Sequence, residues 1–550
     1  MKKANNFQVL ARLFGLVKPL WWVMLLAILL GTLGNLAAIF LTVTAAWGAL
    51  KIIAGHFSQM LLGAVLICGL IRGPLHYGEH YCNHLIAFKL LAIIRVKVFQ
   101  ALRRLSPAKL EGKDKGDLIS LITSDIELLE VYYAHTVSPI AIAALTTIVM
   151  TGFIAHQSLI AGIWALLGYC IVGILIPLIN GRYTGKPGRE VREQLGAMST
   201  YVLDSMYGIE ESLQYDQGPK RLAEMNQRSV SLAKSQKQLA RLGSWQGLAT
   251  NLAVLVFSVG MLGIMAVEFN IGRASLRQFV LATVAMMSSF GPVAALSALS
   301  TTLAQTIAAA RRVLALLDEE PLVTEKTTGS VPAFSGAAMR EVTFAYPGGK
   351  RVLQDFNFAI KPGEIVGIHA PSGSGKSTIL KLLARFYDAD SGQVLLSGDD
   401  IRQLQTKGLR AMESYLAQET WLAHDTIANN IRLGHPDTTL AEVEMAAEKA
   451  SIADFIHTLP NGYDTKLSDL ETGLSDGQKQ RIGIARAFLH AGQFMLLDEI
   501  TANLDALNEG IILKSLKEAA KDKTIIIVSH RQSTLAIADR VLELQPLSAS

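Results

Sequence analysis

Long apolar runs recur through the first half of the chain and do not occur after it. Mostly uncharged runs of about 20 residues or more lie at about 20–47, 57–80, 136–155, 157–180, 243–267 and 278–306. Because a helix of about 20 apolar residues crosses the hydrocarbon of a bilayer, this pattern predicts six transmembrane helices. The first run continues without a charge to Leu50, which is too long for a cleaved signal peptide and indicates a spanning helix.

The connections between these runs differ greatly in length and charge. Those after the second and fourth runs are long, polar and rich in lysine and arginine, whereas the other three are short and carry few basic residues. The positive-inside rule therefore places the long connections and both termini in the cytoplasm. Before the first run, apolar residues at helical spacing predict an interfacial helix over residues 6–18, with Trp21 and Trp22 at the membrane boundary.

The second half of the chain has the pattern of a soluble α/β domain. Charged and proline-containing sequence predicts a linker at 318–333, between a membrane domain at 1–317 and a soluble domain at 334–550. Strand-like runs then alternate with helical ones, and the clearest lie at Val352–Ile360, Glu364–Ile368, Phe494–Leu497 and Thr524–Val528. Such alternation predicts a parallel sheet covered by helices.

Composition agrees with a membrane protein and narrows its chemistry. Of the 550 residues, 50% are hydrophobic and 18% are charged, below the charged fraction of about 25% in soluble proteins. The net charge of +5 is explained by basic cytoplasmic loops, so no nucleic-acid partner is expected. The cysteines, Cys68, Cys82 and Cys170, share no metal-ligand spacing and indicate no disulfide framework.

A glycine-rich stretch of the soluble half predicts a phosphate-binding loop. Ala370–Thr378 stands between a strand-like and a helix-like run, the context that separates this motif from a glycine-rich turn with a chance lysine. Lys376 supplies a charge to the outer phosphates, and the Ser377 hydroxyl suits a magnesium ion. The residues expected to hold a nucleotide are Ser372, Gly373, Ser374, Gly375, Lys376, Ser377 and Thr378. Ala370 replaces the first glycine of the usual pattern, which is costly only where the backbone angles are those of glycine.

Further residues with nucleotide chemistry lie around this loop. Asp498 and Glu499 end an apolar strand-like run, so Asp498 can hold magnesium and Glu499 can polarise the attacking water, although taken alone the pair could be a helix cap. Tyr346 can stack on adenine or serve as a core aromatic. Gln418 and His530 are placed in the sequence to contact the terminal phosphate or its water.

The most specific stretch is Leu474–Arg481, Leu-Ser-Asp-Gly-Gln-Lys-Gln-Arg. It resembles the signature of ABC transporters, and the other motifs follow in that family's order, with Gly462–Thr465 similar to the exporter-type members. The resemblance implies a membrane α-helical domain of exporter fold fused to an α/β P-loop ATPase, using ATP and Mg²⁺, in the cytoplasmic membrane. Ser377, Gln418 and Asp498 are then the expected magnesium ligands, and Glu499, His530 and Gln418 the catalytic residues.

The same resemblance implies a half-transporter. Two ATPase domains close head to tail, and each nucleotide lies between the phosphate loop of one chain and the signature of the other, here Ser475, Gly477 and Gln478. The tips of the long cytoplasmic connections, expected near Gly116–Asp125 and Ile209–Gln217, would carry the contacts between membrane and ATPase domains. The cargo is a small molecule, with membrane lipid around the helices.

One signature residue departs from the family pattern. Asp476 replaces the first glycine of Leu-Ser-Gly-Gly-Gln, so a carboxylate stands close to where the partner's terminal phosphate binds. This favours a heterodimer with one strong and one weak ATP site. The alternative is an active homodimer that tolerates the aspartate, turned away and screened by magnesium.

Four ionisable residues recur at helical spacing in the second apolar run. Arg72, His76, His80 and His84 are spaced four apart and share one helix face. Ionisable residues at membrane depth usually face a cavity and mark a pathway, and histidine is the commonest axial ligand of haem iron. The alternative is a solvated helix end below the bilayer, where histidines are merely polar.

A narrower resemblance covers this region. The stretch from His76 to Phe99, then Arg103–Ala108, Gly116–Leu118 and Asp125–Leu129, is similar to the CydC family, one subunit of the heterodimeric CydDC transporter needed for cytochrome bd assembly. The resemblance implies a CydD-like partner, haem b at His84 and more loosely at His80, and a cargo of haem or a thiol such as cysteine or glutathione. A multidrug, lipid or peptide exporter is the alternative. The six predicted spans exclude a soluble ABC ATPase, and Glu499 and His530 disfavour a channel or receptor.

Overall fold

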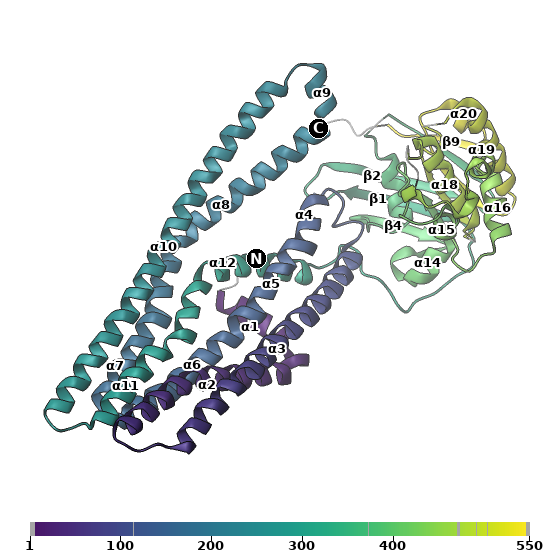
Figure 1. The fold of residues 1–550 in the computed structure, drawn as a ribbon. Coiled ribbons are helices and arrows are strands. Elements are labelled where there is room, and N and C mark those ends of the chain that lie inside the picture. The colour runs from purple at the N-terminus through teal and green to yellow at the C-terminus, as the bar shows by residue number, and fades with distance from the viewer. Residues whose placement is uncertain are drawn as a thin grey trace. The chain divides into compact units, whose positions relative to one another are not determined.

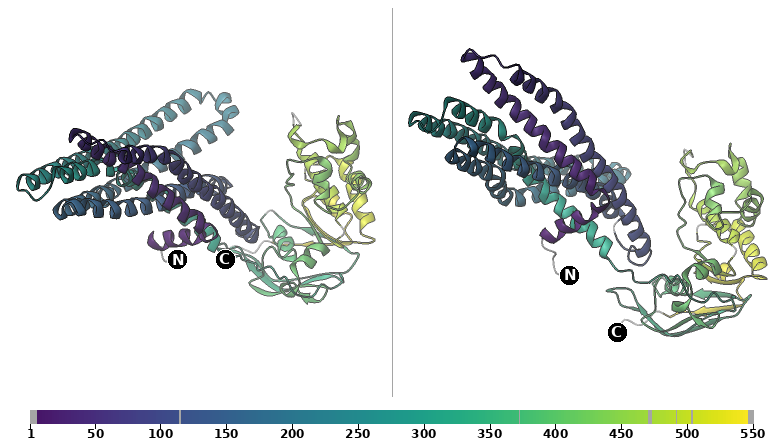
Figure 2. Two further views of the ribbon diagram at one scale, coloured as in Figure 1. Left: turned by 60° about the horizontal axis from the view of Figure 1, so that its bottom comes forward. Right: turned by 90° about the horizontal axis from the view of Figure 1, so that it is seen from below.

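The chain folds into two compact units, described in a computed structural model over residues 6–113, 115–371, 373–469, 473–490, 492–502 and 504–545 (Figures 1 and 2). The first unit, Met1–Leu102 with Lys113–Glu319, consists of helices and their connections, with no strand among its described residues. The second unit, Arg103–Gly112 with Glu320–Ser550, contains the strands. A short segment between two helices of the first unit therefore belongs to the second.

The helices of the first unit are long, and several continue one another without a break. Single π-helical turns, which are rare and occur mostly inside α-helices, join the seventh helix to the eighth and lie on either side of the fifth. The helices are α1 (Asn6–Leu16), η1 (Lys18–Leu20), α2 (Trp21–Ile53), α3 (Gln59–Leu105), α4 (Lys115–Ser120), η2 (Leu121–Asp125), α5 (Ile126–Tyr132), η3 (Tyr133–Val137), α6 (Ser138–Gln157), α7 (Leu159–Cys170), η4 (Ile171–Leu175), α8 (Ile176–Tyr207), α9 (Ile209–Gln214), α10 (Gly218–Asn270), α11 (Leu276–Ser289) and α12 (Gly291–Asp318).

Five helical stretches among the described residues are long and apolar enough to cross a membrane. They are Lys18–Ile53, Ser138–Gln157, Leu159–Tyr207, Gly218–Asn270 and Leu276–Leu296, and each contains or overlaps one of the predicted spans. The remaining predicted span, 57–80, lies in α3, which is not among the five and carries Arg72, His76, Glu79 and His80 within its apolar sequence. A crossing by α3 stays a prediction.

Both long polar connections are helical extensions of the apolar helices. Figure 1 shows α8 and α10 running side by side to the short helix α9 at their tip, so the turn predicted near Ile209–Gln217 is found there. The other predicted tip is wrong, because Gly116–Asp125 is helical and Arg312 forms ion pairs with Asp117 and Asp125 inside the first unit. The turn instead follows Leu105, where Pro107 cannot continue a helix and Gly112 adopts φ +85°.

The predicted N-terminal helix is α1, and it is tied to the end of the helical bundle. The hydroxyl groups of Tyr132 and Tyr133 donate to the backbone carbonyls of Leu10 and Leu13, at 3.1 Å each. The Arg12 guanidinium forms a two-pronged bond to the carboxylate of Asp318, at 2.5 and 2.7 Å. Bidentate pairs of this kind hold two elements in a defined orientation, so the first and last helices of the unit are joined.

The second unit combines two sheets with surrounding helices (Figure 1). A parallel sheet has the order β6-β7-β8-β3-β9, and an antiparallel sheet has the order β2-β1-β4-β5. The strands are β1 (Ala337–Ala345), β2 (Arg351–Ile360), β3 (Ile365–His369), β4 (Ser391–Leu396), β5 (Asp399–Asp400), β6 (Glu413–Leu416), β7 (Phe494–Asp498), β8 (Thr524–Val528) and β9 (Arg540–Glu543). The helices are α13 (Lys376–Leu383), η5 (Ile401–Gln403), α14 (Thr406–Met412), α15 (Ile427–Arg432), α16 (Leu440–Lys449), α17 (Ala453–Thr458), η6 (Gly462–Asp464), η7 (Leu467–Asp469), α18 (Asp476–Leu489), α19 (Ala506–Ala519) and α20 (Gln532–Leu535).

The parallel sheet was predicted and the antiparallel one was not. Strands β3, β7 and β8 match predicted runs, and β7 and β8 are buried along their whole length, as the continuous apolar pattern of a covered parallel strand requires. The predicted strand Val352–Ile360 exists as β2 but pairs antiparallel with β1. Its mixed burial, with several exposed positions, is the mark of a sheet that is covered on one face.

A buried acid in β6 makes the stability of the second unit depend on pH. Burial raises the pKa of Glu413 from 4.5 to about 7, although Arg410 acts in the opposite direction. Between these two values the folded chain holds a proton that the unfolded chain has lost, so this group's stabilising contribution falls as pH rises through that window.

We therefore expect Glu413→Gln to raise the melting temperature of the second unit relative to the wild type more at pH 8 than at pH 5, by at least about 2 °C. Thermal unfolding of the purified full chain measures this difference. Glu518→Gln, at an exposed position of α19, is the matched control. An equal effect of Glu413→Gln at both pH values would contradict the prediction.

Candidate nucleotide site

The predicted phosphate loop connects the end of β3 to the start of α13. Gly373 and Gly375 have φ of +81° and +93°, and a Cβ on Gly375 would lie 2.7 Å from Cγ1 of Val352, so glycine is required there. Ser372 lies outside the described residues. Ala370 is not among the described residues with positive φ, and its methyl group is buried in the core at 3% exposure. Alanine therefore brings no left-handed backbone strain to this position.

Lys376, the first residue of α13, is held inside the loop. Its Nζ donates to the carbonyl of Ala370 at 2.8 Å and lies 3.6 Å from Oε1 of Glu499. The hydroxyl of Ser374, which is also buried, donates to the carbonyl of Pro371 at 2.7 Å. The lysine ammonium is thus held by the backbone of the loop. A phosphate oxygen can replace the Ala370 carbonyl as its hydrogen-bond partner.

Glu499 brings three distant segments together. It follows β7 with φ +48°, and its backbone N–H donates to the carbonyl of Val528 at 2.9 Å. Its carboxylate accepts a hydrogen bond from Nε2 of Gln418 at 3.2 Å and lies 3.7 Å from Nδ1 of His530. Lys376, Gln418 and His530 therefore surround one carboxylate, an arrangement that can orient water beside a terminal phosphate.

Asp498 and Ser377 offer the groups that a magnesium ion requires. Oδ1 of Asp498 is buried without a hydrogen-bond partner among the described residues. Burial raises the pKa of Asp498, while a hydrogen bond from Ser377 lowers it. A cation beside this carboxylate would satisfy the orphaned oxygen and favour the ionised form. The residues fit Mg²⁺, which Asp498 and Ser377 would hold and which would neutralise phosphate charge.

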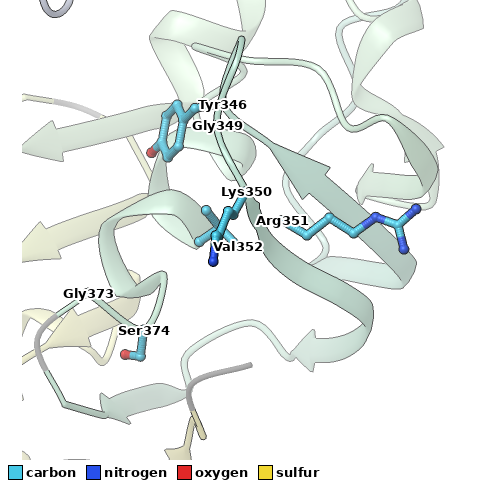
Figure 3. A pocket seen from close by; sticks show the side chains of 7 residues that line it. All are labelled: Tyr346, Gly349, Lys350, Arg351, Val352, Gly373 and Ser374. Carbon is cyan, nitrogen blue, oxygen red and sulfur yellow. The ribbon is translucent and has the colours of Figure 1, made fainter. Parts of the chain in front are cut away.

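A cavity of about 330 Å³ lies beside the loop. It is lined by Tyr346, Gly349, Lys350, Arg351, Val352, Gly373 and Ser374. Tyr346 belongs to this wall, and its hydroxyl lies 3.0 Å from the hydroxyl of Thr378. Figure 3 shows the Lys350 ammonium directed toward the side of Gly373 and Ser374, whereas the Arg351 guanidinium points away. Lys350 and Val352 were not singled out from the sequence, although they directly follow the Tyr346 turn.

The signature residues form the start of α18. Ser475 caps the helix, since its Oγ accepts from the N–H of Gln478 at 3.2 Å while Oε1 of Gln478 accepts from the N–H of Ser475 at 2.8 Å. Within the described residues no hydrogen bond or ion pair joins Ser475, Gly477 or Gln478 to the phosphate loop. Nε2 of Gln480 donates to the carbonyl of Glu499 at 3.1 Å, which ties α18 to the acidic end of β7.

Asp476 does not project as an isolated charge. It is the first residue of α18, and its Oδ1 lies 3.2 Å from Nζ of Lys479, although the aspartate side chain is 77% exposed. An acid in the first helical turn is favoured by the helix dipole, and the lysine screens it further. The local geometry thus reduces, without removing, the negative charge predicted from the sequence.

The predicted histidine face is found on α3, in the helical unit. Nε2 of His76 lies 3.2 Å from Nε2 of His80, and the rings of His80 and His84 stack with centroids 6.4 Å apart. Glu79 and Glu130 end this histidine column, 3.4 Å from Nδ1 of His76 and 3.9 Å from Nδ1 of His84. Across the described part of the chain no group of three or more His, Cys, Asp or Glu side chains is arranged to hold a metal ion.

The phosphate loop, the acids after β7 and the capped signature helix together define an ABC-type ATPase attached to a bundle of apolar helices. Residues 353–502 match the ABC transporter family and residues 20–293 match the ABC transporter transmembrane region. The chain belongs to the ABC transporters, as an exporter half with fused membrane and ATPase domains, and it is a multi-pass membrane protein whose ATPase domain is of the cytoplasmic kind.

Relatives and a solved structure agree with this assignment. The chain is 44% identical over 547 residues to a probable ABC transporter ATP-binding/permease protein of Haemophilus influenzae, covering 99% of each. It is 31% identical to an ATP-dependent lipid A-core flippase of Shewanella frigidimarina, over 87% of this chain and 80% of the relative. A bacterial Atm1-family ABC exporter with ATP bound has the same fold, with a TM-score of 0.81 at 24% identity over 96% of this chain and 94% of that one.

The direction of Lys350 predicts a contact with ATP that the family motifs do not include. We expect Lys350→Ala to raise the KM for ATP about 3–10-fold with little change in kcat, because one exposed charge beside the phosphates is lost. Steady-state ATPase assays at two salt concentrations measure this, and the defect should shrink at high salt.

Arg351→Ala is the matched control, since it removes the same charge from the next residue, whose side chain points away (Figure 3). Equal KM values for the two variants would show that Lys350 makes no specific contact.

Proposed function

We propose that this chain is one half of a heterodimeric, ATP-driven transporter that moves haem or a small thiol such as cysteine or glutathione across the cytoplasmic membrane for cytochrome bd assembly. The proposal extends the ABC exporter assignment in two respects, the identity of the partner and the cargo. The observation that carries the cargo is the histidine column of α3, and the observation that carries the partner is Asp476.

In this proposal ATP is hydrolysed at the phosphate loop and Glu499 of the second unit. Lys376 and the loop N–H groups bind the phosphates, and Tyr346 stacks on the base. Glu499 accepts a hydrogen bond from the attacking water, while Gln418 and His530 hold that carboxylate within 3.2 and 3.7 Å. A loose phosphoryl-transfer transition state needs mainly positioning of the reactants and neutralisation of charge. These side chains would supply both.

The asymmetry follows from which chain donates each signature. This chain's phosphate loop and Glu499 would be completed by the partner's signature, and its own Asp476 would face the partner's terminal phosphate. Lys479 offsets only part of that charge, because both side chains are well exposed, at 45% and 77%, and exposed pairs contribute little. The partner's site is then the weak one. A CydD-like chain with an intact signature is the expected partner.

The cargo follows from the chemistry of the α3 surface. His76 and His80 are exposed and His84 is partly exposed, in a helix that packs beside the strongly apolar α2, where Gly34 lies close to Leu75 and His76. Ionisable side chains at this depth are unfavourable against lipid, so the column faces water or a second subunit. A neutral imidazole there is a suitable axial ligand for the iron of a haem cargo, and Arg72 on the same face suits a propionate.

A lipid is the second candidate cargo. The relative from Shewanella frigidimarina is described as a lipid A-core flippase and aligns with most of this chain. Arg72 on the histidine face of α3 would also suit an anionic lipid headgroup. Binding of haem iron distinguishes the two candidates, because only the haem proposal requires a ligand bond from His84.

The asymmetric-site proposal predicts different outcomes for a catalytic variant and a signature variant. With the partner co-expressed, Glu499→Gln should reduce ATP turnover about 100-fold or more, because the carboxylate that orients water is lost. Asp476→Gly should not reduce turnover, since its site contributes little. Phosphate release by the purified complex measures both. Substantial activity in Glu499→Gln would overturn the asymmetry.

The haem proposal predicts a spectral change that depends on one histidine. Haem added to the purified complex should give a shifted Soret band that His84→Ala abolishes. His56→Ala, an exposed histidine in the connection between α2 and α3, should leave the shift intact.

An unshifted band in the wild type, or an identical band in the His84 variant, would remove haem from the proposal. Uptake of labelled glutathione and of labelled lipid into inverted vesicles would then decide between the thiol and lipid cargoes.

A further inference from the structure

Two histidines one helical turn apart on α3 direct the same ring nitrogen toward each other. Nε2 of His76 lies 3.2 Å from Nε2 of His80. The two rings are nearly perpendicular, at 87°, with centroids 4.4 Å apart. Histidines four residues apart share one face of a helix, and zinc-binding helices use this spacing to present two ligands to one ion.

The separation of the two nitrogens fits a metal ion between them. Two Zn–N bonds of about 2.0–2.1 Å to nitrogens 3.2 Å apart enclose an angle of about 100–106° at the metal, close to the tetrahedral value of about 109°. Imidazole nitrogen is a ligand that suits zinc, copper and nickel ions. An ion of this class can therefore enter the pair with little movement of either ring.

A carboxylate sets the tautomer of His76. Nδ1 of His76 lies 3.4 Å from Oε2 of Glu79. Because an ionised carboxylate only accepts hydrogen bonds, the ring proton of His76 belongs on Nδ1, and Nε2 carries the lone pair that a metal ion requires. A carboxylate behind a ligating histidine also fixes the orientation of the ring. His76 thus has the neighbour of a metal ligand as well as the position of one.

Packing against α2 supports this arrangement from behind. A Cβ on Gly31 would lie 2.8 Å from Cδ of Glu79, and a Cβ on Gly78 would lie 3.0 Å from Cδ1 of Leu30. These close approaches fix the rotation of α3 about its own axis. The side chain of Glu79 is 12% exposed and that of His76 is 64% exposed, so the carboxylate is held in the packed face while the histidine stays accessible.

We propose that His76 and His80 form a binding site for one divalent transition-metal ion of the zinc class, with Glu79 as a positioning residue. No third His, Cys, Asp or Glu side chain completes the site within the described part of the chain, so the other coordination positions are open to water. His84 lies outside the pair, with its ring centroid 6.4 Å from that of His80. The inference goes beyond the proposed transport of haem or a thiol and does not depend on it.

Zinc titration of the purified full-length chain, carrying no polyhistidine tag, tests this site. Measured in competition with a chromogenic chelator, His76→Ala and His80→Ala should each weaken binding of one Zn²⁺ about 10-fold or more, because one of two protein ligands is lost. His80→Cys exchanges one zinc ligand for another and should restore most of the affinity. Glu79→Gln weakens the hydrogen bond to Nδ1 and should cause a smaller loss than either alanine variant.

His56→Ala removes an exposed histidine from the connection between α2 and α3 and should leave zinc affinity unchanged. Both site histidines are exposed, and thermal melting without zinc checks that each variant folds. Zinc binding that survives in both alanine variants would show a hydrogen-bonded histidine pair only and overturn the proposal. A His80→Cys variant that binds zinc no better than His80→Ala would overturn it as well, since the loss would then reflect a distorted helix and not a missing ligand.

Discussion

The nucleotide chemistry depends on the parallel register of three neighbouring strands. Strand β8 lies between β3 and β7, and Ile527 of β8 pairs with Gly367 on one side and with Leu497 on the other. Parallel strands that start in register also end at one edge, so the phosphate loop after β3 and the acids after β7 meet there. The 3.6 Å approach of Lys376 to Glu499 follows from this register, and both residues would lose their role if a strand slipped by one position.

Around that edge, each polar group is either satisfied locally or left for a ligand. The Ala370 and Pro371 carbonyls occupy Lys376 and Ser374, whereas Oδ1 of Asp498 has no partner among the described residues. Buried polar atoms without partners are costly, and a magnesium ion would relieve that cost. The two departures from the family pattern have different weight. Ala370 is accommodated by ordinary backbone angles, while Asp476 keeps a charge that Lys479 only partly offsets.

The helical unit is governed by a different constraint, since lipid offers no hydrogen bonds and no screening. Many large apolar side chains of the spanning helices are therefore exposed, whereas Arg72, His76, His80 and His84 of α3 share one helix face. That face is where the helical unit departs from a plain spanning bundle, and α3 is the one predicted span that is not apolar enough by length and composition alone. Cargo recognition in the proposed function rests on the same departure.

Much of this protein is determined locally and could be read from the sequence. The apolar runs define most of the spans, because a spanning helix satisfies its own backbone and needs only length and hydrophobicity. The motif order places the phosphate loop, the acids and the signature, because each depends on a short stretch with its own backbone geometry. Contacts between distant segments were decided only in three dimensions. Lys350 and the antiparallel sheet were not predicted, since neither side-chain direction nor strand pairing is encoded by a local pattern. The turn after Leu105 was placed too late, although Pro107 and Gly112 mark it locally. The contacts of Lys381 and Tyr387 with Glu111 join residues hundreds of positions apart, 270 in the case of Lys381, and only tertiary packing brings them together.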